Sequence, residues 1–401
     1  MAVSRRAFVE SLVGGRWESR PSASWIAARG HEAFVGEFGQ QAEPAPEGRG
    51  RGRGRGRRGD GRPMVRLSSN ENPLGPSQVA LQAIEKAFSF AGRYPTNAMP
   101  SVNDMKALIA RKNGLEPANV ALGAGSGETL DAAAKAFTGP ARGLVTGLPS
   151  YESPAREVRR MSHPVTEIPV DDRGKLDFEG MIGAATGAGL VFVCNPNNPT
   201  ATVHGSDAIA DLLQRVSAAS PDTVVMVDEA YHDYVTDPAY ASAIPLIPQY
   251  PNLIVSRTFS KAHGMAGLRL GYAVGQAPVI SKLAGWMMVP FNANALVLGA
   301  AHASLEDEAG IARERERNTA VRQFTLDFFT NAGFTPTDAQ TNFVFVKLGR
   351  PAREFSDACR EQGIAVGREF PPMEKAWARV SIGTQDEMDK AVAVFKSVLN
   401  V

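Results

Sequence analysis

Residues 253–274 read LIVSRTFSKAHGMAGLRLGYAV and place one lysine, Lys261, in a loop between two short apolar runs. The runs cover Leu253 to Ser256 and Gly271 to Val274. Runs of this length with almost no polar residue are typical of strands that are buried on both faces of a sheet. The stretch therefore predicts two core strands joined by a polar loop that carries the lysine.

The loop has the composition of a phosphate-binding and aldehyde-binding segment. A lysine amine reacts with an aldehyde when burial or nearby cations lower its pKa, and pyridoxal phosphate is the commonest partner. Thr258 and Ser260 offer hydroxyl donors to the phosphate, and Arg269 offers a permanent charge. Taken alone, the stretch also fits a surface lysine in a Ser/Gly-rich loop, so the interpretation depends on the rest of the chain.

Similar apolar runs alternate with helical patterns on both sides of this loop. Helical spacing covers Glu128 to Phe137 and Ser206 to Ala218. This alternation predicts an open α/β fold with a mostly parallel central sheet flanked by helices. The expected strands are Val120–Gly123, Leu144–Thr146, His163–Ile168, Leu190–Cys194, Val224–Asp228, Leu253–Ser256 and Gly271–Val274.

The two ends of this region predict a second, smaller α/β unit. We expect a large domain at residues 96–291 and a small domain formed by residues 64–95 and 292–401. The elements expected outside the large sheet are a helix at Ser77–Phe90, a helix at Val102–Lys112, one long helix through Leu298 and the charged ARERERN run, strand Phe343–Val346, a helix around Phe355–Gln362, strand Arg379–Ile382 and a last helix ending at Leu399.

The first 63 residues differ in composition from the rest. Residues 1–39 begin with Ser4-Arg5-Arg6, which resembles a twin-arginine export leader, although charged residues interrupt the apolar run that should follow. This pattern slightly favours a cytoplasmic location over export to the periplasm. Residues 40–63 are rich in Pro, Glu, Gly and Arg, include an almost strict Arg-Gly alternation and should form a disordered linker. An RNA-binding role for this linker is disfavoured because it lacks aromatic residues for base stacking.

Composition excludes several classes of protein. The chain has 401 residues, of which 43% are hydrophobic and 21% charged, as in an ordinary globular protein. Seven arginines against Asp60 give residues 49–62 a net charge of +6, so the remainder carries −5 of the total of +1. A mildly acidic body argues against nucleic-acid binding. Two cysteines and six scattered histidines predict neither disulfides nor a metal site, and we expect no membrane association.

Polar residues cluster where the predicted strands end, which is where open α/β sheets bind ligands. Ser126 and Gly127 begin a helix after a strand and form an anion site, or a simple helix cap. Tyr151 lies on a loop where it can stack on a flat ring or be a half-buried loop tyrosine. Asn198 is mounted between prolines in NPNNPT, and Asp228 ends the run VVMVD, where it can hold a protonated pyridine nitrogen or cap a helix.

From about Leu67 onward the chain resembles the aspartate aminotransferase superfamily of fold type I, which depends on pyridoxal phosphate (PLP). Within it, the chain is most similar to histidinol-phosphate aminotransferases. The resemblance rests on nine motifs in the family's order: NENPLGP, RYP, GAGSGE, PSY, NPNNPT, DEAY, TFSK, GLRLGY and ARVSIGT. It implies a large domain with a mostly parallel sheet, a smaller α/β domain, PLP as cofactor and a homodimer with shared active sites.

The resemblance also implies a role for each matching residue. Lys261 forms the Schiff base with PLP and moves the proton at the substrate's alpha carbon. Asp228 pairs with the ring nitrogen, and Tyr151 stacks on the ring. Arg379, in ARVSIGT, clamps the substrate carboxylate by the fork geometry of its guanidinium. The remaining cofactor contacts implied are Asn198 and Tyr231 to the ring oxygen, Ser126, Gly127, Thr258, Ser260 and Arg269 to the phosphate, and Tyr94 to the phosphate of the other subunit's cofactor.

The substrate end departs from the family pattern. In histidinol-phosphate aminotransferases an arginine shortly before the carboxylate clamp binds the substrate phosphate. Here Gly367 stands near that place and Arg368 follows it, so Arg368 is a candidate substrate contact together with Arg379 and Asn198. His263, next to Ala262, is expected to be a structural loop residue near the cofactor.

The function predicted is transfer of an amino group between an amino acid, or a histidinol-phosphate-like amine, and a 2-oxo acid by a ping-pong mechanism. The alternative within PLP chemistry is a decarboxylase or lyase on the same scaffold, for example one acting on threonine phosphate. Arg379 argues mildly against decarboxylation, because it holds the carboxylate in place. A regulator of this fold, without catalysis, would carry a winged-helix domain that residues 1–63 cannot form.

Overall fold

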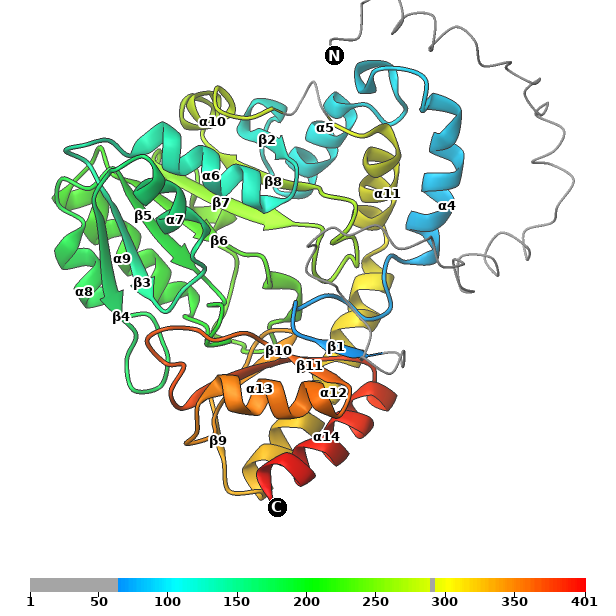
Figure 1. Cartoon of the computed structure of the whole chain (residues 1–401). Helices are drawn as coiled ribbons and strands as arrows, with labels where there is room; N and C mark the ends of the chain where they lie inside the picture. Colours follow the sequence, from blue (N-terminus) through cyan, green and yellow to red (C-terminus); the bar gives the residue numbers. More distant parts are fainter. Residues whose placement is uncertain (1–63, 289–292) are drawn as a thin grey trace, which may run out of the picture. The chain divides into compact units, whose positions relative to one another are not determined.

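The computed structural model describes residues 64–288 and 293–401 (Figure 1). The proposed leader at residues 1–39 and the Arg/Gly-rich linker at residues 40–63 lie outside the described residues. Within the described ranges, no helix is long and apolar enough to cross a membrane. The same ranges contain no group of three or more His, Cys, Asp or Glu side chains placed to hold a metal ion.

A seven-stranded sheet organises the larger part of the fold, with the order β2-β8-β7-β6-β5-β3-β4. Strand β8 runs antiparallel to both of its neighbours, and the other pairs are parallel. The predicted α/β fold with a mostly parallel sheet is confirmed. The strands are β2 (Val120–Gly123), β3 (Leu144–Leu148), β4 (Val165–Pro169), β5 (Leu190–Cys194), β6 (Val224–Asp228), β7 (Leu253–Thr258) and β8 (Gly271–Gly275).

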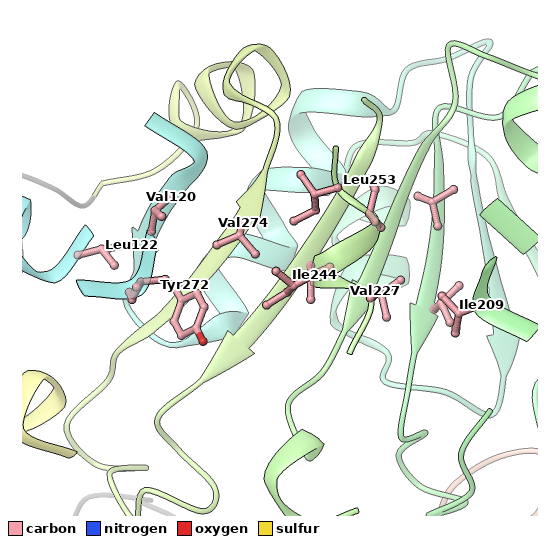
Figure 2. Close-up of a cluster of buried hydrophobic side chains, with 14 of the residues drawn as sticks. Val120, Leu122, Ile209, Val227, Ile244, Leu253, Tyr272 and Val274 are labelled. Atoms are coloured by element: carbon pink, nitrogen blue, oxygen red, sulfur yellow. The ribbon is translucent and has the colours of Figure 1, made fainter. Parts of the chain in front are cut away.

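Both faces of this sheet are buried, because alternate residues of each strand enter different apolar clusters. Figure 2 shows one cluster, which includes Val227, Leu253 and Val274 of the strands and Ile209 of a covering helix. Phe192 and Ile254 belong to the other cluster. Helices α5 (Val102–Lys112), α8 (Phe178–Ala184), α9 (Ser206–Ala219) and α11 (Ala295–Glu306) contribute to the first cluster, and α6 (Ser126–Phe137), α7 (Ser153–Arg160) and α10 (Ala277–Ala284) to the second.

A second group of strands and helices has its own apolar core around Phe329, Phe343, Phe355 and Phe395. Its antiparallel sheet has the order β12-β10-β9, and β1 pairs in parallel with β11. The elements are β1 (Val65–Leu67), β9 (Thr335–Pro336), β10 (Phe343–Lys347), β11 (Ile364–Val366), β12 (Trp377–Ser381), α12 (Glu308–Asn331), α13 (Ala352–Glu361) and α14 (Gln385–Leu399).

The single long helix expected through Leu298 and the ARERERN run is instead two helices, α11 and α12. They separate at Asp307, whose backbone is not helical (φ −86°, ψ 62°) and whose side chain accepts a hydrogen bond from the Gly310 N–H. Asp at this position satisfies a free N–H of the second helix, so a new helix begins there.

The helix expected at Ser77–Phe90 consists of α4 (Gln78–Ala87) and a 3-10 turn, Phe88–Phe90. Helix α4 packs along α11, which lies more than two hundred residues later in the chain (Figure 1). The segment between β1 and α4 connects the two apolar cores, because Leu67 of β1 belongs to one and Ala80 of α4 to the other. It also passes the carboxyl ends of the large sheet, where its residues line a cavity with the last residues of three strands.

Candidate active site

A cavity of about 380 Å³ lies beyond the carboxyl ends of β5, β6 and β7. The segments that line it include the last residues of these strands, the β1–α4 segment and the loop before β12. The structure thus brings together residues that are far apart in the sequence. Twelve predicted site residues line the cavity: Ser126, Gly127, Tyr151, Asn198, Asp228, Tyr231, Thr258, Ser260, Lys261, Arg269, Arg368 and Arg379.

Asp228, the last residue of β6, is buried in the cavity wall, with 3% of its surface exposed. Its Oδ1 has no hydrogen-bond partner among the described residues. Burial, and then the charge of Glu229, raise the pKa of Asp228 to about 7. A buried carboxylate oxygen without a donor is costly, and the N–H of a protonated pyridine ring is a fitting partner. This oxygen is therefore the first sign that the cavity suits PLP.

Lys261 presents its amine to the same cavity from the loop that follows β7. Its Nζ donates a hydrogen bond to the Asn70 carbonyl at 3.1 Å and lies 5.5 Å from the centre of the Tyr231 ring. Burial and the nearby Arg379 guanidinium lower the pKa of Lys261 to about 8. The surface-lysine alternative does not fit this position, and a larger share of the amine is neutral near pH 7 than in an exposed lysine.

An anion-binding cradle lies at the N-terminus of α6. The helix begins at Ser126 after Gly125, whose φ of +78° is accessible mainly to glycine. A Cβ at Gly125 would collide with the guanidinium of Arg269, which packs there and donates to the Ala124 carbonyl at 3.3 Å. Ser260 Oγ accepts from Thr258 Oγ1 at 3.0 Å, so the predicted hydroxyls are adjacent. Helix N-terminus, hydroxyls and arginine together fit a phosphate.

Arg379 reaches the cavity from β12 and is 7% exposed. Its Nη1 donates to Asn198 Oδ1 at 2.7 Å and its Nη2 to the Ser68 carbonyl at 2.7 Å, whereas Nε has no partner among the described residues. Burial lowers the pKa of Arg379 to about 10. The guanidinium is therefore a buried cation whose hydrogen bonds within the described residues all go to neutral acceptors, and it lies 4.6 Å from the centre of the Phe370 ring.

Asn70 lines the cavity although its position in the sequence did not predict a role in the site. Its carbonyl accepts from Lys261, its Nδ2 donates to the Tyr231 hydroxyl at 3.1 Å, and its Oδ1 accepts from Ser381 Oγ at 2.7 Å. It has a left-handed φ of 54°, which asparagine tolerates better than most residues. The NENPLGP motif that contains Asn70 was the available signal, although it does not identify the contacts.

Arg368 lies at the mouth of the cavity and is already paired. Its Nη2 lies 2.7 Å from Glu152 Oε1, and its guanidinium lies 4.5 Å from the centre of the Phe370 ring. Position 367 must be small, because a Cβ on Gly367 would lie 2.6 Å from the Arg379 carbonyl oxygen. An arginine at position 367 is thus excluded by packing, and the neighbouring Arg368 has a carboxylate partner of its own.

Two other residues from the sequence analysis lie apart from the cavity. Tyr94 is 80% exposed and does not line it. The role implied for Tyr94 concerns another subunit's cofactor, so one chain does not test it. His263 also lies outside the cavity, where its Nδ1 is 2.7 Å from Ser304 Oγ and its ring packs on Phe259.

An α/β fold with a lysine, a buried aspartate and a phosphate cradle at the carboxyl ends of the sheet defines a fold type I PLP enzyme. Residues 62–395 match the family described as aminotransferase class I and II. The chain therefore belongs to this aminotransferase family, and PLP is its cofactor, as its motifs predicted.

Relatives with established names agree with this assignment. Histidinol-phosphate aminotransferase 2 of Ralstonia nicotianae is 35% identical, over 84% of this chain and 89% of the relative. Histidinol-phosphate aminotransferase 2 of Methylococcus capsulatus is 36% identical, over 84% of this chain and 90% of the relative. The crystal structure of histidinol-phosphate aminotransferase from Sinorhizobium meliloti in complex with pyridoxal-5'-phosphate has a TM-score of 0.77 at 26% identity, covering 96% of this chain and 99% of that one. These relatives do not favour the decarboxylase alternative.

Proposed function

We propose that the chain transfers the amino group of an α-amino acid to a 2-oxo acid by a ping-pong mechanism, with Arg379 as the carboxylate clamp. The observation that carries this proposal is the guanidinium of Arg379, which is buried in the cavity wall and has no carboxylate partner among the described residues. A buried charge is costly unless it is paired. A substrate carboxylate, bound by two parallel hydrogen bonds, would supply the missing negative charge.

The other residues would then act around the bound substrate. PLP, when bound, acts as an electron sink for the negative charge that develops at the substrate's alpha carbon. The Lys261 amine would take the proton from that carbon and deliver it to the cofactor, and it would reverse this transfer in the second half-reaction, which is general acid–base catalysis suited to a pKa near 8. Asp228 would hold the proton on the ring nitrogen, and Ser126, Ser260 and Arg269 would hold the phosphate.

Histidinol phosphate, the substrate named for the relatives, is the second candidate for the amine. Its phosphate could take the place of the carboxylate at Arg379. However, the packing around Gly367 leaves no room for an arginine at position 367, and the neighbouring Arg368 is paired with Glu152. A phosphate carries about two charges and is best held by several cations. The charge balance of the cavity therefore favours the α-amino acid.

A half-reaction screen tests the proposal. The PLP form of the full chain is mixed with a panel of amino acids and with histidinol phosphate, and the loss of the cofactor's visible absorbance is followed. We expect conversion with at least one amino acid at a higher rate than with histidinol phosphate. Faster conversion with histidinol phosphate would overturn the substrate proposal, and release of carbon dioxide without a keto acid would overturn transamination.

The division into two domains, residues 96–291 and residues 64–95 with 292–401, is also a proposal. It is supported by the origin of the site residues, since the phosphate cradle comes from the first part and Arg368 and Arg379 from the second. The packing of α4 on α11 is consistent with it, because both helices fall in the second part. These helices also contribute Ala80 and Leu298 to the core of the large sheet, so the boundary runs close to them.

We further propose that the chain forms a homodimer that completes both sites. Ten large apolar side chains are exposed in the described residues, and six of them fall within residues 74–99: Leu74, Val79, Leu81, Phe88, Tyr94 and Met99. Such a concentration of exposed apolar residues usually marks an interface. In a dimer, Tyr94 would be able to reach the partner's phosphate cradle.

Light scattering of the full chain should therefore give about twice the 42.8 kDa of one chain. The variant Tyr94→Phe should keep this mass but bind PLP more weakly, by on the order of threefold to tenfold for one lost hydrogen bond. Tyr250→Phe serves as the matched control, because Tyr250 lines a separate small pocket and not the active-site cavity. A monomer with normal PLP affinity would contradict the proposal.

A further inference from the structure

Two consecutive carboxylates at the end of β6 face different cavities. Asp228 lines the active-site cavity, whereas Glu229 lines a second cavity of about 400 Å³ together with Arg257. Thr258 lines both cavities, so they lie on the two sides of the end of β7. The transamination roles assigned above use Asp228 and leave Glu229 and Arg257 without a function.

Glu229 is held by a complete set of donors, and its side chain is 1% exposed. Arg257 Nε and Nη2 donate to Oε2 at 3.0 and 2.9 Å. Ser242 Oγ lies 2.8 Å from Oε2, and the Ala243 N–H donates to Oε1 at 2.7 Å. Charge-assisted bonds of this kind are stronger than neutral ones, so the position of Glu229 is well defined.

The pair also connects two neighbouring strands of the sheet. Glu229 directly follows β6, and its backbone N–H donates to the Ser256 carbonyl of β7 at 2.8 Å. Arg257 belongs to β7, which continues through Thr258 to the loop of Lys261. The ion pair therefore holds Glu229, the residue next to Asp228, against β7, the strand that leads to Lys261.

The charge of Glu229 acts directly on Asp228. Burial is the main cause of the raised pKa of Asp228, and the negative charge of Glu229 is the second. Like charges in adjacent buried positions disfavour the ionised form of each other. A cation placed on the far side of Glu229 opposes this effect, and Arg257 is in that position.

We propose that Arg257 is a positioning residue for the PLP site: by pairing with Glu229 it compensates the charge behind Asp228, so that Asp228 presents an ionised carboxylate to the cofactor's ring nitrogen. This inference rests on the PLP-dependent function proposed above. It concerns the binding of the cofactor and makes no assumption about which amine is the substrate.

Other titratable groups surround the two carboxylates and stay the same in every variant considered below. The groups that act on Asp228 or are affected by it are Tyr151, Cys194, Tyr240 and Lys261. The groups around the ion pair are His232, whose Nδ1 is 3.9 Å from Glu229 Oε2, and Asp233, Tyr240, His263 and Tyr272. Because they are unchanged, differences between variants report on the ion pair.

The test compares two single variants that should shift the pH dependence of PLP binding in opposite directions. In Arg257→Gln the unpaired Glu229 carboxylate should raise the pKa of Asp228, so the loss of PLP affinity on acidification should begin at a higher pH. In Glu229→Gln the unpaired Arg257 should lower that pKa, so the loss should begin at a lower pH. Each shift should be on the order of one pH unit. The double variant Glu229→Gln/Arg257→Gln should return close to the wild-type profile.

The measurement is the dissociation constant of PLP for the full-length apoprotein as a function of pH, which needs no turnover. Arg315→Gln is the matched control, because Arg315 lines the second cavity but donates to the Asp233 carbonyl instead of Glu229. The control should follow the wild-type profile.

Shifts in the same direction in both single variants, or weaker binding without any shift, would overturn the proposal and indicate a purely structural pair. If Arg257→Gln does not fold, the profile of Glu229→Gln alone decides, since the absence of a downward shift contradicts the proposal. A wild-type protein that binds no PLP would instead contradict the underlying function.

Discussion

Replacing Lys261 by alanine is expected to lower turnover by on the order of a thousandfold or more, because the group that moves the proton at the alpha carbon is lost. The same change should remove the covalent link to PLP that borohydride reduction traps. No other lysine lines the active-site cavity among the described residues. A second amine is therefore not available to replace it.

The measurement combines single-turnover amino transfer with mass spectrometry of the borohydride-reduced protein. Lys347→Ala is the control, because Lys347 is an exposed residue of β10 and lies outside the cavity. The control should keep both the cofactor link and the turnover. Circular dichroism establishes that the Lys261 variant is folded. Amino transfer at the wild-type rate by a folded Lys261→Ala protein would mean that another residue carries the reaction.

The sequence was sufficient to predict the large sheet because its strands are buried on both faces. Such strands appear as short continuous apolar runs, and all seven expected runs are strands in the structure. The direction of β8 was not predictable in this way. An apolar run has the same composition whether it pairs in parallel or antiparallel, and β8 returns antiparallel between β2 and β7.

Several cavity residues were predictable because they end or follow a strand at the same edge of the large sheet. Lys261, Asp228 and Asn198 stand at such positions, and the order of the motifs gave them roles. The contacts of Asn70 were not predictable, since its hydrogen bonds to Ser381 span 311 residues of sequence. Contacts of this length depend on how the second group of strands docks, and no local pattern encodes that.

The pairing of charges was also hidden from the sequence. Arg368 and Arg379 look equivalent as cations near a substrate, but the structure distinguishes them, because Glu152 pairs with Arg368 whereas no carboxylate of the described residues pairs with Arg379. The pairing of Glu229 with Arg257 was likewise not predictable from the sequence. Glu229 lies within the DEAY motif and Arg257 directly precedes TFSK, and only their bonding in three dimensions indicates an electrostatic role.

Replacing Arg379 by glutamine is expected to raise KM for the amino acid strongly while the covalent PLP link is retained. Truncating one partner of a buried charge pair costs on the order of 2–5 kcal/mol, equivalent to roughly 30-fold to 5,000-fold. The change also removes the donor to Asn198 Oδ1, so part of the loss reflects a less ordered Asn198. Arg379→Lys should recover little of the affinity, because an ammonium does not form the two parallel bonds of a guanidinium.

A comparison of two amines separates the clamp from a general loss of activity. An α-amino acid and the corresponding amine without the carboxylate should differ strongly in kcat/KM in the wild type, because only the first compensates the buried charge of Arg379. In Arg379→Gln this preference should largely disappear. Arg353→Gln, on the exposed face of α13, is the control and should keep the preference. If Arg379→Gln discriminates between the two amines as well as the wild type does, the substrate carboxylate binds elsewhere, and the unpaired cation of Arg379 must have another ligand.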